Sequence, residues 1–253
     1  MLQELVAGQF YAFLMVFIRV GAALLIMPTV GEPFVPARVR LLLALALSVV
    51  VTPAAAPMIP PQTSSAADMV VLIMAESLVG LFIGTIARTM LAALETAGSV
   101  IANQVGLAAA QAFNPALAAP GNAISALLGI VALLLVFATD LHHMLILAVI
   151  DSYGVFAPGA PLPMGDIVQH LTRVFGQSFL VGLQMSAPFV VIGLLFNLGL
   201  GLVSRLVPQI QIFFIGVPIQ IVFGLLLLGL SMSALMLFWM AAFEEELVGL
   251  LGR

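Results

Sequence analysis

The chain contains two long apolar runs, Ser186–Ser204 and Ile212–Met240, with the short polar segment Arg205-Leu-Val-Pro-Gln-Ile-Gln211 between them. A second polar segment, Gly216-Val-Pro-Ile-Gln220, lies inside the second run. An unpaired polar group in hydrocarbon costs several kcal/mol, so lipid alone does not favour an arginine and three glutamines at these positions. We therefore expect these polar side chains to contact something other than lipid. The identity of that contact bears directly on the function of the chain.

The composition is that of a protein with several membrane spans. Of the 253 residues, 63% are hydrophobic and 7% are charged, whereas a soluble domain is about half apolar and about a quarter charged. This composition argues against a water-soluble enzyme. The net charge of −4 is thinly spread, so no nucleic-acid partner is expected.

Six stretches are long enough to cross a bilayer, which takes about 20 residues. They are roughly 5–30, 39–59, 69–94, 122–150, 170–204 and 212–241. We expect an all-α membrane-type protein of about six long, kinked helices, with Pro188 as a candidate kink in the fifth. The region Glu95–Gly121 between the third and fourth stretches is rich in Ala, Gly, Asn and Gln. We expect it to be re-entrant or buried against protein.

The arginines indicate an orientation. Arg38 and Arg40 lie between the first two stretches and Arg205 lies between the last two, whereas loops 53–68 and 151–166 hold acidic residues and no basic ones. By the positive-inside rule, the arginine loops face the cytoplasm and both termini face the opposite side.

Four residues, Glu76, Gly80, Gly84 and Arg88, recur every four positions, which places them along one helix face. The two glycines would let another backbone approach closely, and the flanking charges would pair with neighbours instead of lipid. Charges inside a membrane are functional-site candidates in general. For this stripe we favour the alternative, in which ion pairs fix the register of packed helices.

The sequence contains no recognisable set of catalytic residues. Arg19, Glu95 and Asp140 are further charges at membrane depth, but no nucleophile–base pair accompanies them. Asp140 with His142 and His143 could form a proton relay or a polar helix end at the membrane surface, and we favour the helix end. The three histidines do not predict a metal site, and the absence of cysteine removes thiolate ligands. We therefore expect no enzymatic activity, no metal and no cofactor.

Motifs along nearly the whole length resemble those of the FliR family of flagellar export-gate proteins, known as SctT in injectisomes. The chain shares Phe17-Ile-Arg19, Met27-Pro28, Gln104-Val-Gly106 and Asn114-Pro115, and the resemblance is strongest from Ser204 to Gly224. In and around the last connection, the residues expected to contact partners are Arg205, Pro208, Gln209, Gln211, Gly216, Pro218 and Gln220. The order and spacing of the motifs together are specific, although each one alone is weak.

The resemblance implies a fold and a role. One such chain would join several copies of FliP-like and FliQ-like subunits in a right-handed helical gate of kinked helical hairpins, through which unfolded proteins cross the bacterial inner membrane. Residues 1–185 would be a FliP-like hairpin portion and residues 186–253 a FliQ-like hairpin. Partner subunits would then receive the polar residues of the last connection. An FlhB-like switch protein and a place in the flagellar basal body are also implied.

By the same resemblance, the segment around 104–121 would be an inward loop that constricts the closed pore. An apolar ring there could block ions by dewetting. The stretch Gly106-Leu-Ala-Ala-Ala-Gln-Ala-Phe113 has only Leu107 and Phe113 as large apolar residues. These two are the candidates for the seal, unless homologous loops of partner chains supply more of it.

A stand-alone secondary transporter is the main alternative. Helices broken at Pro188 and Pro218, with charges near the midplane, would suit a transporter, but the chain lacks matching halves. A third interpretation is an intramembrane enzyme subunit, for which Glu76, Asp140 or His143 would be needed for turnover.

Overall fold

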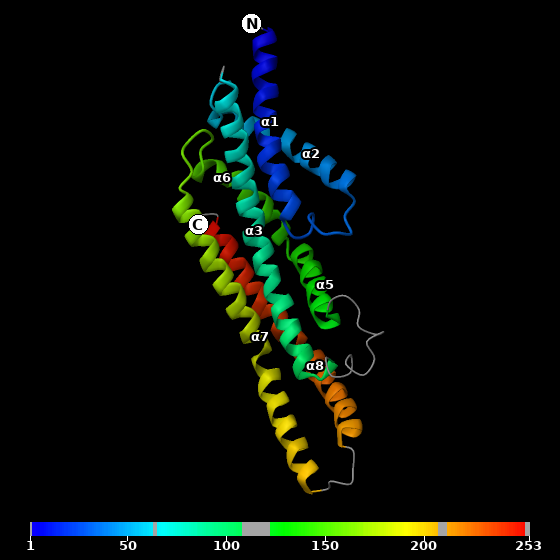
Figure 1. The fold of residues 1–253 in the computed structure, drawn as a ribbon. Coiled ribbons are helices and arrows are strands. Elements are labelled where there is room, and N and C mark those ends of the chain that lie inside the picture. The colour runs from blue at the N-terminus through cyan, green and yellow to red at the C-terminus, as the bar shows by residue number, and fades with distance from the viewer. Residues whose placement is uncertain (1, 63–64, 108–121, 207–211, 251–253) are drawn as a thin grey trace. The chain divides into compact units, whose positions relative to one another are not determined.

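The computed structural model of the protein consists of long α-helices and their connections (Figure 1). It describes residues 2–62, 65–107, 122–206 and 212–250, with side chains from residue 8 in the first helix and from residue 215 in the last. The helices are α1 (Leu2–Ile26), α2 (Ala37–Ala55), the short 3-10 helix η1 (Ala56–Met58), α3 (Ala66–Gln104), α5 (Ala123–Ala138), α6 (Leu141–Val155), α7 (Met164–Leu206) and α8 (Ile212–Leu250). The described residues include no strand, so the predicted all-α class is confirmed.

Prolines mark several helix ends. Pro28 follows α1, Pro36 precedes α2 and Pro163 precedes α7. Proline has no N–H to donate inside a helix, but its fixed φ suits positions just outside one or in its first turn. These three prolines therefore set where the chain turns between apolar stretches.

Pro188 and Pro218 do not break their helices. Each lies inside a continuous helix, Pro188 in α7 and Pro218 in α8. The adjacent side chains Phe189 and Val217 are buried, and this packing outweighs the backbone hydrogen bond that a proline removes. The helix breaks considered for these two positions are therefore wrong.

The bend in the fourth apolar stretch comes from another residue. Among the residues that the structure describes, five helices are long and apolar enough to cross a membrane, and α5 with α6 forms a sixth candidate only if the bent pair counts as one span. The chain bends by 74° between these two helices, where Asp140 adopts left-handed φ and ψ values of 59° and 13°. Aspartate tolerates this conformation because its short polar side chain can bond locally. The apolar stretch predicted at 122–150 is therefore a broken span or a re-entrant hairpin.

The helix α3 is longer than the sequence suggested. We expected the third apolar stretch to end near residue 94, but α3 continues to Gln104. Ala93, Ala97 and Ile101 are fully buried, and their spacing of four residues continues one packed face past the predicted end. The rest of the predicted re-entrant segment, 108–121, lies outside the described residues.

The chain forms two compact units. The first comprises Met1–Met90, Leu135–Phe175 and Glu244–Arg253, and the second comprises Leu91–Leu134 and Gly176–Phe243. The core of unit 1 includes residues of α1 and α3 that are at most 1% exposed, namely Met15, Val16, Ile83 and Ile86. The boundary predicted at residues 185 and 186 falls inside α7. This boundary separates the part expected to resemble FliP from the part expected to resemble FliQ, and it stays a prediction.

Unit 2 is built from parts of α3, α5, α7 and α8. Its largest fully buried side chains include Leu94, Phe189 and Trp239. Gly182 lets α7 approach α3, because a Cβ at this position would lie 2.7 Å from the carbonyl oxygen of Ala93. Helix backbones come this close where small residues replace bulky ones.

Candidate functional sites

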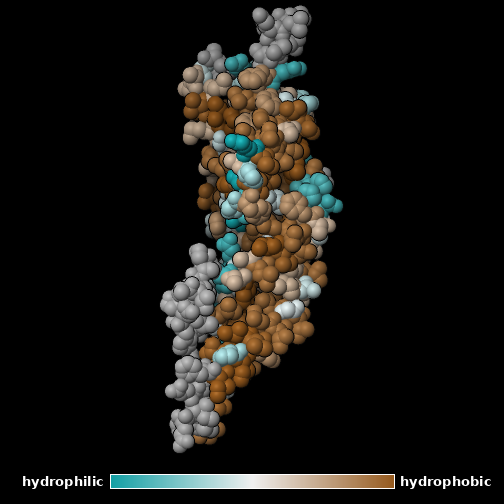
Figure 2. Space-filling model, turned by 90° about the vertical axis from the view of Figure 1, so that its right-hand side faces the viewer, coloured by the Kyte–Doolittle hydropathy of each residue, from teal (hydrophilic) through white to brown (hydrophobic). Residues whose placement is uncertain are grey.

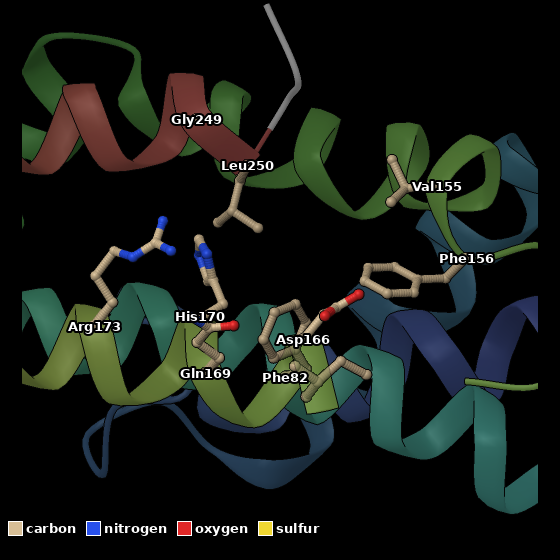
Figure 3. A pocket seen from close by; sticks show the side chains of 10 residues that line it. Phe82, Val155, Phe156, Asp166, Gln169, His170, Arg173, Gly249 and Leu250 are labelled. Carbon is tan, nitrogen blue, oxygen red and sulfur yellow. The ribbon is translucent and has the colours of Figure 1, made fainter. Parts of the chain in front are cut away.

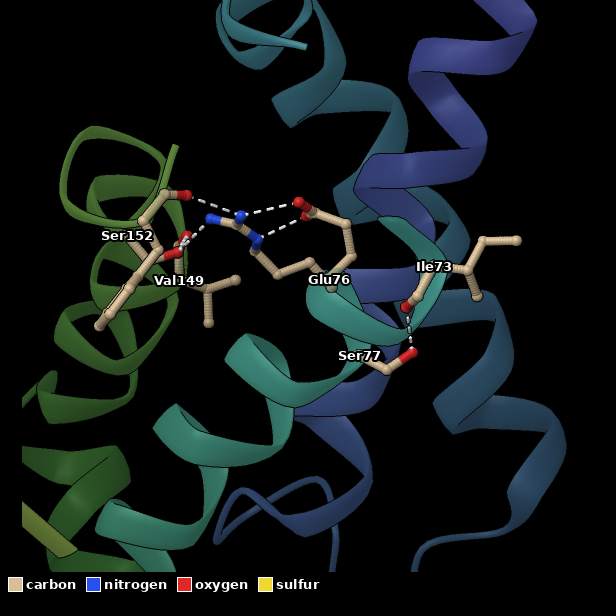
Figure 4. Close-up of polar contacts among 7 residues, drawn as sticks. Ile73, Glu76, Ser77, Val149 and Ser152 are labelled. Atoms are coloured by element: carbon tan, nitrogen blue, oxygen red, sulfur yellow. Dashed lines mark hydrogen bonds and ion pairs between the residues drawn. The ribbon is translucent and has the colours of Figure 1, made fainter. Parts of the chain in front are cut away.

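A buried arginine–glutamate pair joins α1 to α3 in unit 1 (Figure 4). Nε of Arg19 donates to Oε2 of Glu76 at 2.7 Å, and Nη2 donates to Oε1 at 2.9 Å. Both side chains are 1% exposed. The two parallel hydrogen bonds form the fork geometry in which a guanidinium binds a carboxylate most strongly.

The other contacts of Arg19 reach α6 and the residue that follows it. Nη1 donates to the hydroxyl of Ser152 at 3.1 Å, and Nη2 donates to the carbonyl of Phe156 at 2.9 Å. The guanidinium also lies over the ring of Tyr153, 3.9 Å from its centre. All three guanidinium nitrogens and both oxygens of Glu76 are thus engaged within the unit. The cluster therefore holds α1, α3 and the end of α6 together, and the Glu76 carboxylate is not free to act as an acid or a base.

The glycines of the predicted stripe face α1. A Cβ on Gly84 would lie 2.7 Å from the carbonyl oxygen of Ala23, and a Cβ on Gly80 would collide with the carbonyl oxygen of Arg19. No ordinary side chain fits at either position. The two helices can therefore bring Arg19 and Glu76 within bonding distance only because α3 carries glycine here.

Arg88 lies at the far end of this stripe and contacts the α1–α2 loop. Its Nη1 forms an ion pair with Oε1 of Glu32, whose side chain is 9% exposed. Arg40, in the first turn of α2, donates to the carbonyls of Val30, Glu32 and Val35 at 3.2 to 3.3 Å. Two arginines therefore hold the loop. Glu32 was not identified from the sequence. The feature that could have revealed it is the position of an acidic residue between Gly31 and Pro33, in the connection between two apolar stretches.

In unit 2, α8 holds the end of α3. Nε2 of Gln220 donates to the carbonyl of Gln104 at 2.7 Å, and the Gln220 side chain is buried. A Cβ on Gly224 would lie 2.6 Å from a methyl group of Val105, so this glycine makes room for the residue that follows α3. We expected a partner subunit to receive the Gln220 amide, and the structure provides an acceptor within the chain.

The remaining predicted site residues lie near the edges of the described segments. Leu107 is half-buried and directly follows Gly106, which has a φ of 86°. Arg205 is exposed at the end of α7, Gly216 is buried and Pro218 is exposed. Phe113, Pro208, Gln209 and Gln211 lie outside the described residues.

A pocket of about 350 Å³ lies in unit 1, beside the start of α7 and the end of α8 (Figure 3). Phe82, Asp166, His170 and Arg173 line it. Nε2 of His170 is 3.1 Å from Oε1 of Glu246. The ten lining residues include no serine, threonine or cysteine, so no hydroxyl or thiol nucleophile faces the histidine.

The surface of the chain is apolar over long distances. Apolar side chains cover most of the face shown in Figure 2. The exposed large apolar residues of α7 are Met164, Val168, Phe175, Phe179, Leu180, Leu183, Val190, Val191, Leu194, Leu195, Leu198, Leu202, Val203 and Leu206. They are sparse in the first three turns, where Asp166, Gln169, Thr172 and Arg173 are also exposed, and frequent from Phe175 onward. Because the stretch from Phe175 to Leu206 has 32 residues and the hydrocarbon layer spans about 20 residues of a helix, this apolar surface is about one and a half times as long as lipid can cover.

Comparisons with known proteins identify the family. Residues 10–246 match the model of the bacterial export proteins, family 1. The flagellar biosynthetic protein FliR of Caulobacter vibrioides is 37% identical over 241 residues, which covers 95% of this chain and 96% of that protein. FliR of Bacillus subtilis is 33% identical over 229 residues, with 89% and 88% covered. The Yop proteins translocation protein T of Yersinia pestis is 30% identical over 162 residues, with 63% and 62% covered. The chain therefore belongs to the bacterial export proteins of family 1, the FliR/SctT family that its motifs resemble.

Proposed function

We propose that this chain is a core subunit, of the single-copy type, of a flagellar type III protein export gate. With FliP-like and FliQ-like subunits it forms the channel through which unfolded substrates cross the bacterial inner membrane. The names of its relatives, flagellar biosynthetic protein and translocation protein, support a component of a type III export apparatus. The several apolar helices support a multi-pass membrane protein of that apparatus.

The apolar surface of α7 is the observation that carries the proposal. Exposed apolar residues are frequent over the 32 positions from Phe175 to Leu206, whereas a bilayer covers about 20 helical residues. Tilting does not resolve the excess, since transmembrane helices rarely tilt beyond about 40°. Apolar surface outside the hydrocarbon must be covered by protein. Neighbouring subunits with similar long helices provide such a cover.

Residues 186–253, which comprise the second half of α7 and all of α8, are the FliQ-like part in this proposal. Their connection carries the exposed Arg205 and the sequence Pro208-Gln209-Ile-Gln211, and partner subunits receive these polar groups. Residues 1–185 are the FliP-like part. The segment 104–121 faces the channel, with Leu107 and Phe113 in its seal.

Co-expression with the FliP-like and FliQ-like subunits of the same bacterium tests the proposal. Purification through a tag on this chain in mild detergent should recover both partners in excess over the tagged chain. Native mass spectrometry of the complex measures the ratio. A stable chain that binds neither partner, and that takes up a small solute after reconstitution alone, would overturn the proposal in favour of a transporter.

A further inference from the structure

The corner between α5 and α6 gathers three residues with metal-binding side chains. Asp140, His142 and His143 each place a ligand atom within 4.8 Å of the other two. Asp140 precedes α6 in the left-handed conformation at the 74° bend. The amide of His143 donates to the carbonyl of Asp140 at 2.9 Å. The backbone of the corner is thus held in the shape that brings these side chains together.

The spacing within this cluster suits a transition-metal ion. Oδ1 of Asp140 and Nδ1 of His143 lie 3.3 Å apart. Two ligands that are each about 2.0–2.2 Å from a tetrahedral zinc ion lie roughly 3.3–3.6 Å apart. The pair already has the separation that joint coordination of one ion requires.

The second imidazole is oriented by its surroundings. Nδ1 of His142 lies 3.4 Å from the carbonyl oxygen of Val136, and the ring packs against Phe137 with the ring centres 5.1 Å apart. The carbonyl favours a proton on Nδ1, which leaves the lone pair of Nε2 free for a ligand bond. Histidines that bind metals usually donate their other N–H to such an acceptor, which fixes the ring orientation.

We propose that Asp140, His142 and His143 bind a divalent transition-metal ion of the zinc type. Two imidazoles and one carboxylate suit zinc, nickel or copper, whereas magnesium and calcium prefer oxygen ligands alone. Three protein ligands leave one tetrahedral position for water or for a group of a partner subunit. The Asp140 and His143 side chains are 76% and 65% exposed, so an ion reaches them without opening the unit. A bound ion joins the residue at the bend to the first turn of α6.

Metal titration of the purified full-length chain tests this site. After treatment with a chelator, the chain is titrated with Co²⁺, whose visible absorbance reports tetrahedral coordination, and then with Zn²⁺ as a competitor. We expect one Co²⁺ per chain, displaced by Zn²⁺. His142→Ala and His143→Ala should each weaken binding by at least about tenfold, since loss even of groups that only orient the ligands costs 10–100-fold in affinity. Asp140→Asn should also weaken binding, and asparagine tolerates the left-handed backbone as aspartate does.

The third histidine of the chain provides a matched control. His170 lies 3.1 Å from Glu246 and outside the cluster, so His170→Ala should leave the Co²⁺ spectrum and affinity unchanged. Zn²⁺ should raise the melting temperature of the parent chain but not that of His143→Ala, and Mg²⁺ should raise neither. A Zn²⁺ affinity that His142→Ala and His143→Ala both leave unchanged would overturn the proposal. An Asp140–His143 ion pair without metal binding gives no Co²⁺ band and would overturn it equally.

Discussion

At the scale of single residues, Arg19 determines how three segments of unit 1 meet. Its guanidinium donates to Glu76 of α3, to Ser152 of α6 and to the carbonyl of Phe156. A buried ion pair is not a strong source of stability by itself, because taking both charges from water offsets most of their attraction. Removing one partner of a buried ion pair is strongly destabilising, because the remaining charge stays buried without a partner. The pair therefore acts mainly as a device that fixes the register of α1 against α3.

The first prediction concerns this pair. Glu76→Leu should lower the free energy of unfolding by about 3–5 kcal/mol, because it leaves the Arg19 charge uncompensated. Combining it with Arg19→Met should recover much of the loss, since a buried pair replaced by apolar groups of similar volume is often neutral. Thermal unfolding of the purified chain in detergent measures both. Equal stability of Glu76→Leu and the parent chain would contradict the assigned role.

Gly84 supports the second prediction at this scale. Gly84→Leu should separate α1 from α3, because even a Cβ there would lie 2.7 Å from the carbonyl oxygen of Ala23. The expected loss is at least the 1–3 kcal/mol typical of overpacking, and the yield of folded chain should fall before any partner is added. Gly129→Leu is the matched control, since a Cβ at that helical glycine meets nothing within 4 Å. The comparison uses size-exclusion profiles and thermal unfolding, and similar behaviour of the two variants would count against close packing at Gly84.

At the scale of helices, the sequence predicts where helices exist better than where they bend. The apolar stretches are long, so their helical nature follows from length and composition. The bend at Asp140 has no proline or glycine to announce it, whereas Pro188 and Pro218 suggest breaks that packing overrides. Likewise, Arg19 and Glu76 are conspicuous as charges, but they are 57 positions apart. Their pairing depends on how α1 lies on α3, which no local pattern encodes.

The third prediction concerns the end of α3. Gln220→Ala should leave the partly buried Gln104 carbonyl without its donor, and the loss of a typical hydrogen bond costs about 0.5–1.5 kcal/mol. The effect should be local, so hydrogen exchange of residues 101–106 should speed up by roughly 2- to 12-fold, which corresponds to this energy range. Gln184→Ala is the control, because that glutamine is exposed on α7. If exchange at residues 101–106 is unchanged in Gln220→Ala, α8 does not hold the end of α3.

At the scale of the whole molecule, we expect the exposed apolar surface, and not the core, to determine whether the chain binds partner subunits. The fourth prediction is that Leu198→Arg, at a position 58% exposed on α7, abolishes co-purification with FliP-like and FliQ-like subunits. The chain itself should still fold, because the side chain makes little contact with its own core. A charge placed in an apolar interface has no partner and costs several kcal/mol. Thr172→Arg is the control, since this exposed residue lies close in sequence to the exposed Asp166 and Arg173. Normal recovery of partners with Leu198→Arg would mean that lipid, and not protein, covers this part of α7.

The last prediction rests on the proposed export gate and concerns the channel of that gate in its closed state. Replacing Leu107 and Phe113 together with glycine removes the two large apolar side chains of the stretch 106–113, so water should enter the constriction and ions should follow. We expect normal assembly with partners but an increased ion leak in liposomes that contain the purified complex. Leu107→Ile with Phe113→Leu keeps apolar bulk and should keep the channel closed. Because both double variants alter the same positions, a difference in leak isolates side-chain size as the cause. An unchanged leak in the glycine variant would assign the seal to loops of the partner chains, and the two residues would then have no part in closing the pore.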